Sequence, residues 1–166
     1  MPALLIFDRL LLLATSIMLA ALTAAMTVVV LLGVFTRYVL NDALPWTEEL
    51  ARYILIWLSW LGGGIAMRRG SHIAVDLFID KLSPRARSVI VFLGRSLVLV
   101  FLAICVIYGL DLARRVGMQS TIALGISMQI PYASVPVGAA LMLYHLAVIM
   151  FVPLPSEQRD LQTEVS

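Results

Sequence analysis

Charged residues divide the chain into four long apolar stretches. The first covers 10–36, which are 27 residues between Arg9 and Arg37. A helix of this length rises about 40 Å, more than the ~30 Å hydrocarbon core of a bilayer, so it can cross the membrane with a tilt. The apolar run of a secretory signal is only roughly 7–15 residues long, which favours an uncleaved membrane helix here.

The second stretch is apolar over 53–67, which is too short to cross a bilayer by itself. The preceding segment extends it, because Thr47 has the character of a helix N-cap and the two glutamates after it suit the positive end of a helix dipole. We therefore expect a spanning helix over 47–68. Arg52 and Arg68 are expected to extend their side chains toward opposite membrane surfaces.

The third stretch follows Ser83-Pro84, a combination typical of an N-cap and the first residue of a helix. This pair predicts a helix from Pro84 to Arg115, of which 88–114 crosses the membrane. Arg95 falls near the start of that span. We expect its side chain to reach the headgroup region rather than to act as a buried functional cation.

The fourth stretch is the longest, with 41 uncharged residues after Arg115. Pro131 and Pro136 indicate that regular helix begins near them, because proline is favoured in the first turn and disfavoured further inside. We expect the last span over 131–152. Residues 118–130 then form an apolar connector that is either re-entrant or lies on the membrane surface.

A shorter segment between the second and third stretches does not span. His72, Asp76 and Asp80 recur at intervals of four among apolar residues, which predicts an amphipathic helix over 72–82 in the plane of the interface. Alternating residues also fit a strand, but an isolated strand at a membrane surface leaves its backbone unpaired. A metal site is the less favoured interpretation of the polar stripe, since the zinc-binding helix motif needs a second histidine.

The composition agrees with lipid as the solvent. Apolar residues make up 61% of the 166 residues and charged residues 13%, whereas soluble domains have roughly 25% charged residues. We therefore predict an all-α integral membrane protein with four transmembrane helices. One membrane domain covers 1–152, and 153–166 form a flexible cytoplasmic tail. Nothing supplies the basic, aromatic-rich face of a nucleic-acid-binding protein.

Basic residues predict the orientation. With both termini in the cytoplasm, eight basic residues lie inside and four outside, as the positive-inside rule requires. The inside set is Arg9, Arg68, Arg69, Lys81, Arg85, Arg87, Arg95 and Arg159. The outside set is Arg37, Arg52, Arg114 and Arg115.

Few residues could carry chemistry. Cys105 is the only cysteine, which excludes an intrachain disulfide, and we expect it to be a small packed residue. His145 lies midway through the last apolar stretch, and we interpret it as a hydrogen-bonded packing histidine or a subunit contact. A Walker loop, a nucleophile elbow and an inverted repeat are all missing from the sequence. We therefore predict neither an enzyme nor a complete transporter, and no cofactor.

The second predicted helix has an unusually bare surface. Some of its small residues are four apart, a spacing that lets helix backbones approach closely in lipid. Trp57 and Trp60 lie beside them, which predicts tight packing against this bundle or a larger partner. Glu48 precedes Arg52 by four residues and suits either a modest surface pair or a tether for a partner. The small residues are Ser59, Gly62, Gly63, Gly64 and Ala66.

A longer string carries a family resemblance. It begins with Trp46-Thr47-Glu48-Glu49-Leu50-Ala51-Arg52 and continues with Trp57, Gly62-Gly63, Met67-Arg68-Arg69-Gly70-Ser71-His72-Ile73-Ala74-Val75-Asp76 and Leu82-Ser83-Pro84. Further along come Ile130-Pro131-Tyr132 and Val135-Pro136-Val137-Gly138. From about 10 to 152 the chain thereby resembles the DctQ-type small membrane subunit of tripartite ATP-independent periplasmic (TRAP) transporters.

The resemblance implies a place in the bacterial inner membrane and two protein partners. A periplasmic binding protein captures an organic acid, and a large membrane subunit, scaffolded by the small one, carries it inward with a cation, usually Na⁺. The alternative is a stand-alone four-span assembly or regulatory protein. The candidate interface or family-motif residues are Trp46, Glu48, Glu49, Arg52, Trp57, Ser59, Trp60, Gly62, Gly63, Ala66, Arg68, Gly70, His72, Asp76, Pro136 and Gly138.

Overall fold

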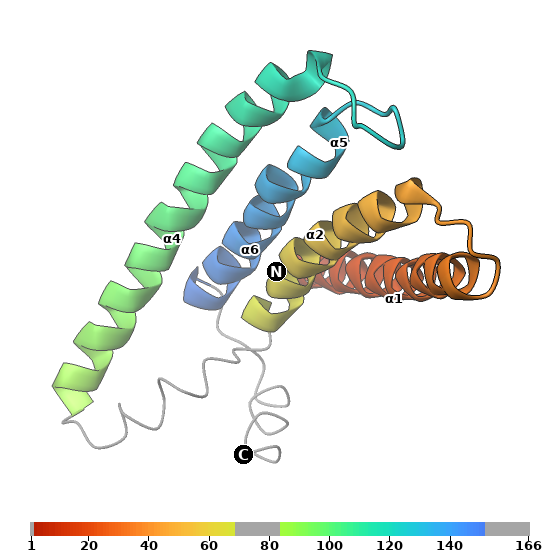
Figure 1. Cartoon of the computed structure of the whole chain (residues 1–166). Helices are drawn as coiled ribbons and strands as arrows, with labels where there is room; N and C mark the ends of the chain where they lie inside the picture. The colour runs from red at the N-terminus through yellow and green to blue at the C-terminus, as the bar shows by residue number, and fades with distance from the viewer. Residues whose placement is uncertain (1, 69–83, 152–166) are drawn as a thin grey trace.

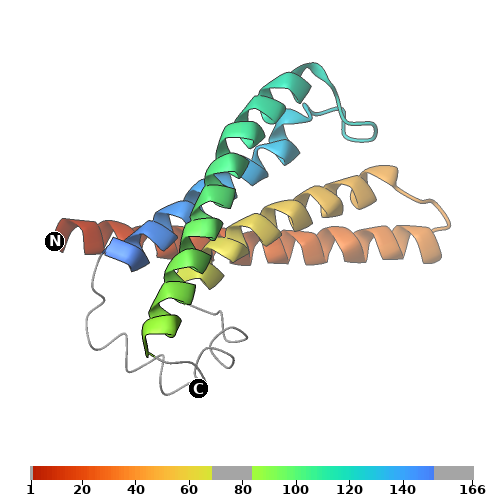
Figure 2. The ribbon, with the colours of Figure 1, turned by 90° about the vertical axis from the view of Figure 1, so that its left-hand side faces the viewer.

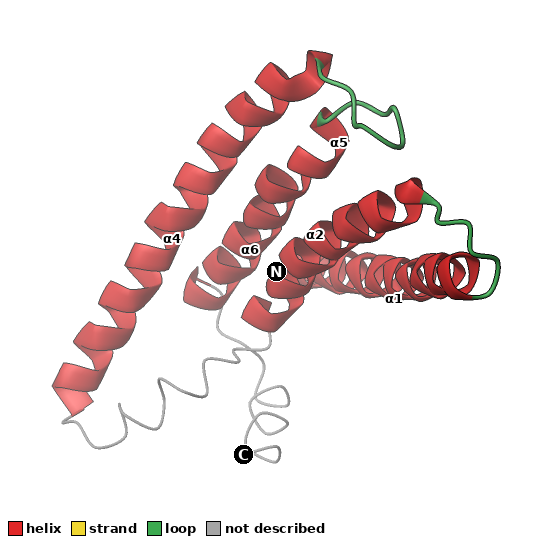
Figure 3. Cartoon of the chain, in the orientation of Figure 1, coloured by secondary structure: helices red, strands yellow, loops and turns green. Residues whose placement is uncertain are grey.

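The computed structural model describes residues 2–68 and 84–151, and all of their regular structure is helical apart from one isolated β-bridge (Figure 3). The expected interfacial helix over 72–82 and the tail over 153–166 lie outside the described residues. The helices are α1 (Pro2–Tyr38), α2 (Pro45–Arg68), α4 (Pro84–Arg115), η1 (Val116–Met118), α5 (Gln129–Tyr132) and α6 (Ser134–Phe151).

Within the described residues, four helical segments are long and apolar enough to cross a membrane. The all-α membrane fold predicted from the sequence is therefore confirmed. α4 has the bounds that its proline start predicts, whereas α2 begins at Pro45, two residues before the expected N-cap. Thr47 instead lies in the first turn of α2, where its hydroxyl donates a hydrogen bond of 2.7 Å to the carbonyl of Leu44.

The four long helices form a row in the order α1, α2, α6, α4 (Figure 1). Seen from the side, the α1–α2 and α4–α6 pairs diverge toward the loops that join their members (Figure 2). The last span, Gln129–Met150, is the most enclosed. In its most apolar stretch 39% of the residues are buried, whereas none are buried in the corresponding stretch of α1. α1 is therefore left to face lipid or another protein over most of its length.

The core lies between α4, α6 and α2. Leu102, Ala139 and Leu146 form its buried centre, and Cys105 packs against them as a small apolar residue. The other partly buried residues around this centre are Trp60, Met67, Val98, Leu99, Val106, Met142, Leu143 and Met150.

The connector between α4 and α6 is a tight loop. Ser120 and Ser127 face each other in an isolated antiparallel bridge, and the amide of Met128 donates to the carbonyl of Gln119 at 2.9 Å. At the tip, Gly125 has a φ of 67°, a left-handed conformation that glycine adopts without steric cost. Met118 and Ile122 are each 97% exposed. The sequence left the form of this connector open, and the structure gives it a defined turn.

Candidate functional site

A buried ionic cluster joins three helices near the N-terminal end of α1. Arg68, at the end of α2, donates from Nε and Nη2 to Asp8 Oδ2 at 3.1 and 2.8 Å. His145 of α6 places its Nδ1 3.4 Å from the other oxygen of Asp8. The exposed fractions are 2% for Asp8, 8% for Arg68 and 0% for His145. The cluster thus fixes α1, α2 and α6 against one another.

This cluster corrects one prediction and decides between two others. Arg68 was expected to extend toward the membrane surface, but Asp8 holds it inside because a buried guanidinium needs a charged partner. His145 is fully enclosed by its own chain, which favours packing over a subunit contact. The expected hydrogen bond is not formed, because neither ring nitrogen has a hydrogen-bond partner among the described residues. Tyr144 supports this end, since its ring contacts Phe7 edge to face with centroids 5.8 Å apart.

The sequence reasoning missed Asp8. It lies next to Arg9 at the edge of the first apolar run, so it resembled an ordinary flanking charge. One signal was available: α1 continues back to Pro2, so Asp8 lies almost two turns into a membrane helix, where an acid needs a partner. The structure supplies that partner from a residue 60 positions away.

The opposite end carries two acidic contacts, one at the exposed Glu48 and one at the half-buried Glu49. Glu48 was expected to pair with Arg52 along the same helix. Its carboxylate instead accepts a hydrogen bond from Arg37 of α1, and the paired side chains are 51% exposed for Arg37 and 57% for Glu48. The pair therefore joins α2 to α1 across the 39–44 loop, where Asn41 adopts a left-handed φ of 53°.

Glu49 clamps the connector. Its carboxylate accepts hydrogen bonds from the backbone amides of Ile122, Ala123 and Leu124 at 3.3, 2.7 and 2.9 Å. The hydroxyl of Tyr53 donates to the same carboxylate at 2.8 Å. Three successive amides directed at one anion form a backbone nest. Glu49 is thus the residue that holds the loop between α4 and α6 against α2.

The small residues of α2 divide between two faces. A Cβ atom built on Gly63 would lie 2.3 Å from Met142 Cε, and one on Gly64 would lie 2.6 Å from Leu141 Cδ2. In return, a Cβ atom on Gly138 would lie 2.5 Å from Trp60 Cβ. These glycines allow α2 and α6 to approach closely.

The other face of α2 has no partner within the described residues. Its members are spaced three and four apart, so they form one continuous stripe along the helix. A Cβ atom built on Gly62 would have nothing within 4 Å. We call this surface the open stripe, and its members are Arg52, Leu55, Ser59, Gly62 and Ala66.

The remaining candidates are placed as follows. Trp46 and Trp57 are half-buried, and Pro136 is buried in α6 beside Gly109. Gly70, His72 and Asp76 lie outside the described residues. Across 2–68 and 84–151, no group of three His, Cys, Asp or Glu side chains is arranged to hold a metal.

Within the described residues, four apolar helices and a tightly packed α2–α6 pair define an all-α multi-pass membrane protein. Residues 26–154 match the family described as tripartite ATP-independent periplasmic transporters, DctQ component. The chain belongs to this family. It is the small permease subunit of a TRAP transporter, a multi-pass protein of the inner membrane, and it is not an enzyme.

Named relatives agree. The chain is 36% identical over 123 residues to the sialic acid TRAP transporter small permease protein SiaQ of Vibrio cholerae, covering 74% of this chain and 71% of the relative. It is 24% identical over 110 residues to the C4-dicarboxylate small permease protein DctQ of Rhodobacter capsulatus, covering 65% and 48%. It is also 34% identical over 106 residues to the isethionate TRAP transporter permease protein DctMQ of Oleidesulfovibrio alaskensis, covering 63% and 17%.

Proposed function

We propose that this chain scaffolds a large permease subunit that takes up an organic acid. The observation that carries the proposal is the open stripe of α2, whose small residues would let a second protein's helix approach closely in lipid. The match to only 17% of the DctMQ permease protein supports a larger partner, because that relative has much more chain than this one. The stand-alone alternative has no such support.

The cargo and the coupling belong to the same proposal. Two relatives are named for sialic acid and isethionate, both organic acids. The family resemblance adds coupling to a cation gradient, usually Na⁺, and delivery by a periplasmic binding protein. With both termini cytoplasmic, the Glu49-clamped connector faces the periplasm, where its exposed Met118 and Ile122 are accessible to that binding protein.

Co-purification with the large subunit tests the open stripe. Gly62→Leu adds a side chain where the partner is expected, at a position where a Cβ atom has nothing within 4 Å in this chain. We expect co-purification in mild detergent to fall about tenfold, because overpacking a close contact typically costs roughly 1–3 kcal/mol. Gly94→Leu on α4, also with open space at its Cβ, is the matched control. It should co-purify with the large subunit as well as the parent does. Equal behaviour of the two variants would contradict the stripe as the interface.

Reporter fusions test the orientation. A C-terminal reporter that is active only in the cytoplasm should give a signal, because the excess of basic residues places the C-terminus on that side. A C-terminal reporter that is active only in the periplasm would contradict the proposed topology and move the connector to the other side.

A further inference from the structure

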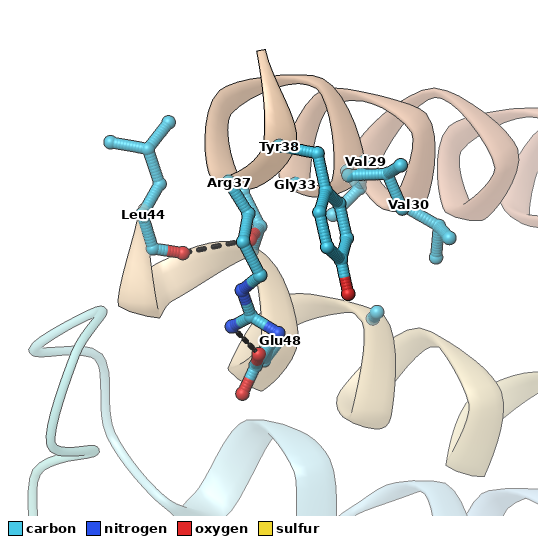
Figure 4. Close-up of a pocket in the computed structure, with 10 residues that line it drawn as sticks. Val29, Val30, Gly33, Arg37, Tyr38, Leu44 and Glu48 are labelled. Atoms are coloured by element: carbon cyan, nitrogen blue, oxygen red, sulfur yellow. Dashed lines mark hydrogen bonds and ion pairs between the residues drawn. The ribbon is translucent and has the colours of Figure 1, made fainter. Parts of the chain in front are cut away.

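A half-open groove with a volume of about 150 Å³ lies between the C-terminal part of α1 and the start of α2. Its walls are mostly apolar side chains from both helices and from the end of the loop between them (Figure 4). At Gly33 the helices are close, since a Cβ atom there would lie 2.8 Å from the hydroxyl oxygen of Thr47. The apolar lining residues are Val29, Val30, Val34, Leu44 and Ala51.

Charged and polar groups gather at one edge of this groove. Arg37 reaches from α1 to Glu48 of α2, and the Tyr38 side chain extends from α1 toward α2 (Figure 4). Among the described residues, the contact uses one nitrogen of Arg37 and one oxygen of Glu48. A guanidinium has five N–H donors and a carboxylate has a second oxygen, so both groups can bind a further ligand.

The sequence sets the depth of this edge in the membrane. The first apolar run ends at Arg37, and the charged residues of α2 precede its apolar part. The charged edge therefore lies at headgroup level, and the valine-lined groove lies beside the acyl chains. A phospholipid is the molecule that presents charge and hydrocarbon at these two levels.

The charge of the edge selects the headgroup. Arginine matches a phosphodiester through paired N–H donors. Glu48 repels a lipid with net negative charge, but it accepts hydrogen bonds from a primary ammonium, which a choline headgroup cannot donate. We propose that this groove binds a phosphoethanolamine lipid, with its phosphate on Arg37, its ammonium on Glu48 and one acyl chain along the valines. The proposal does not depend on the transport cargo.

Native mass spectrometry of the full chain with added lipids tests this assignment. The chain is released from mild detergent after exposure to equal amounts of phosphatidylethanolamine, phosphatidylcholine and phosphatidylglycerol with the same acyl chains. We expect phosphatidylethanolamine to be retained about tenfold over each of the other two, since charge-assisted hydrogen bonds are the strong ones. Equal retention of the three lipids, or a preference for phosphatidylglycerol, overturns the assignment.

Variants separate the headgroup from the acyl chain. Glu48→Gln should remove the preference over phosphatidylcholine, whereas Arg37→Gln should lower retention of all three lipids. Ala51→Phe fills the groove with an uncharged side chain and should abolish retention even if the charge variants fold poorly. Arg114→Gln changes an exposed cation of α4 outside the groove and should behave like the parent. Unchanged retention in Ala51→Phe would contradict the groove as the site. Absence of bound lipid from the complex with the large subunit, measured in the same way, would also contradict it.

Discussion

The two ends of the bundle use charge in opposite ways. At one end, Asp8 and Arg68 have side chains only 3% and 8% exposed, and together with His145 they link α1, α2 and α6. At the other end, Arg37 and Glu48 are more than half exposed and join neighbouring helices. Removing one partner of a buried pair leaves an uncompensated charge, whereas an exposed partner is simply hydrated. The comparison indicates that the buried end fixes the helix arrangement and the exposed end remains available for ligands.

The largest expected effect is from Asp8→Asn. It leaves Arg68 buried without a charged partner, so we expect the free energy of unfolding to fall by about 3–5 kcal/mol. A mixed-detergent unfolding titration followed by circular dichroism measures this change. Asp8→Leu combined with Arg68→Met removes both charges and should recover most of the loss. A fall below about 1 kcal/mol in Asp8→Asn would place this pair with the exposed one and end the distinction between the two ends.

A packing contact between the ends provides the next test. Gly138→Ala places a methyl group 2.9 and 3.0 Å from the backbone carbon and oxygen of Trp60, which cannot rotate away. We expect a loss of about 1–3 kcal/mol in the same titration. Gly62→Ala is the matched control, with open space at its Cβ, and should be neutral. A larger loss in Gly138→Ala than in Asp8→Asn would show that helix packing, not the buried ions, dominates the arrangement.

Glu49→Gln sharpens the description of the exposed end. The variant loses the anion that accepts three backbone amides of the connector, so the loop should open locally while the helices stay folded. Hydrogen exchange should therefore accelerate at Ile122, Ala123 and Leu124 but not in α6. Glu48→Gln, one residue away, is the control and should leave these three amides protected. Equal protection in Glu49→Gln and the parent would show that the loop holds its shape without the clamp.

The smallest effect is expected from Arg37→Gln. Exposed ion pairs contribute roughly 0–1 kcal/mol and are screened by salt. The small difference from the parent should disappear in 1 M NaCl, about the concentration at which the Debye length falls to ~3 Å. The effect of Asp8→Asn should persist at the same salt concentration, because buried pairs are screened much less. Persistence of the Arg37→Gln effect at high salt would show that this pair acts as a buried one.

Several features could be predicted because they depend on short stretches of chain. The long apolar runs identify the membrane helices, and Pro84 marks the residue at which α4 begins. The TRAP motif from Trp46 onward identifies the family, which residues 26–154 confirm. These signals are local, so neither the order of the helices nor their rotation is needed to interpret them.

The partners of the charged residues could not be predicted in this way. Glu48 has Arg52 at a favourable spacing on its own helix, yet it pairs with Arg37 because the 39–44 loop returns α2 against α1. Glu49 contacts amides 73 to 75 residues away, and Arg68 contacts an acid 60 residues away. Such contacts exist only once the helices are assembled.

The sequence by itself determined that this chain is a four-span membrane protein of the TRAP small-subunit family. Only the tertiary structure decided that Gly63 and Gly64 face α6 while Gly62 remains open. In water, hydrophobic periodicity marks the buried face of a helix. In lipid, the outer face is as apolar as the inner one, so the rotation of α2 is set by close packing against α6 and by the buried pair that holds its end.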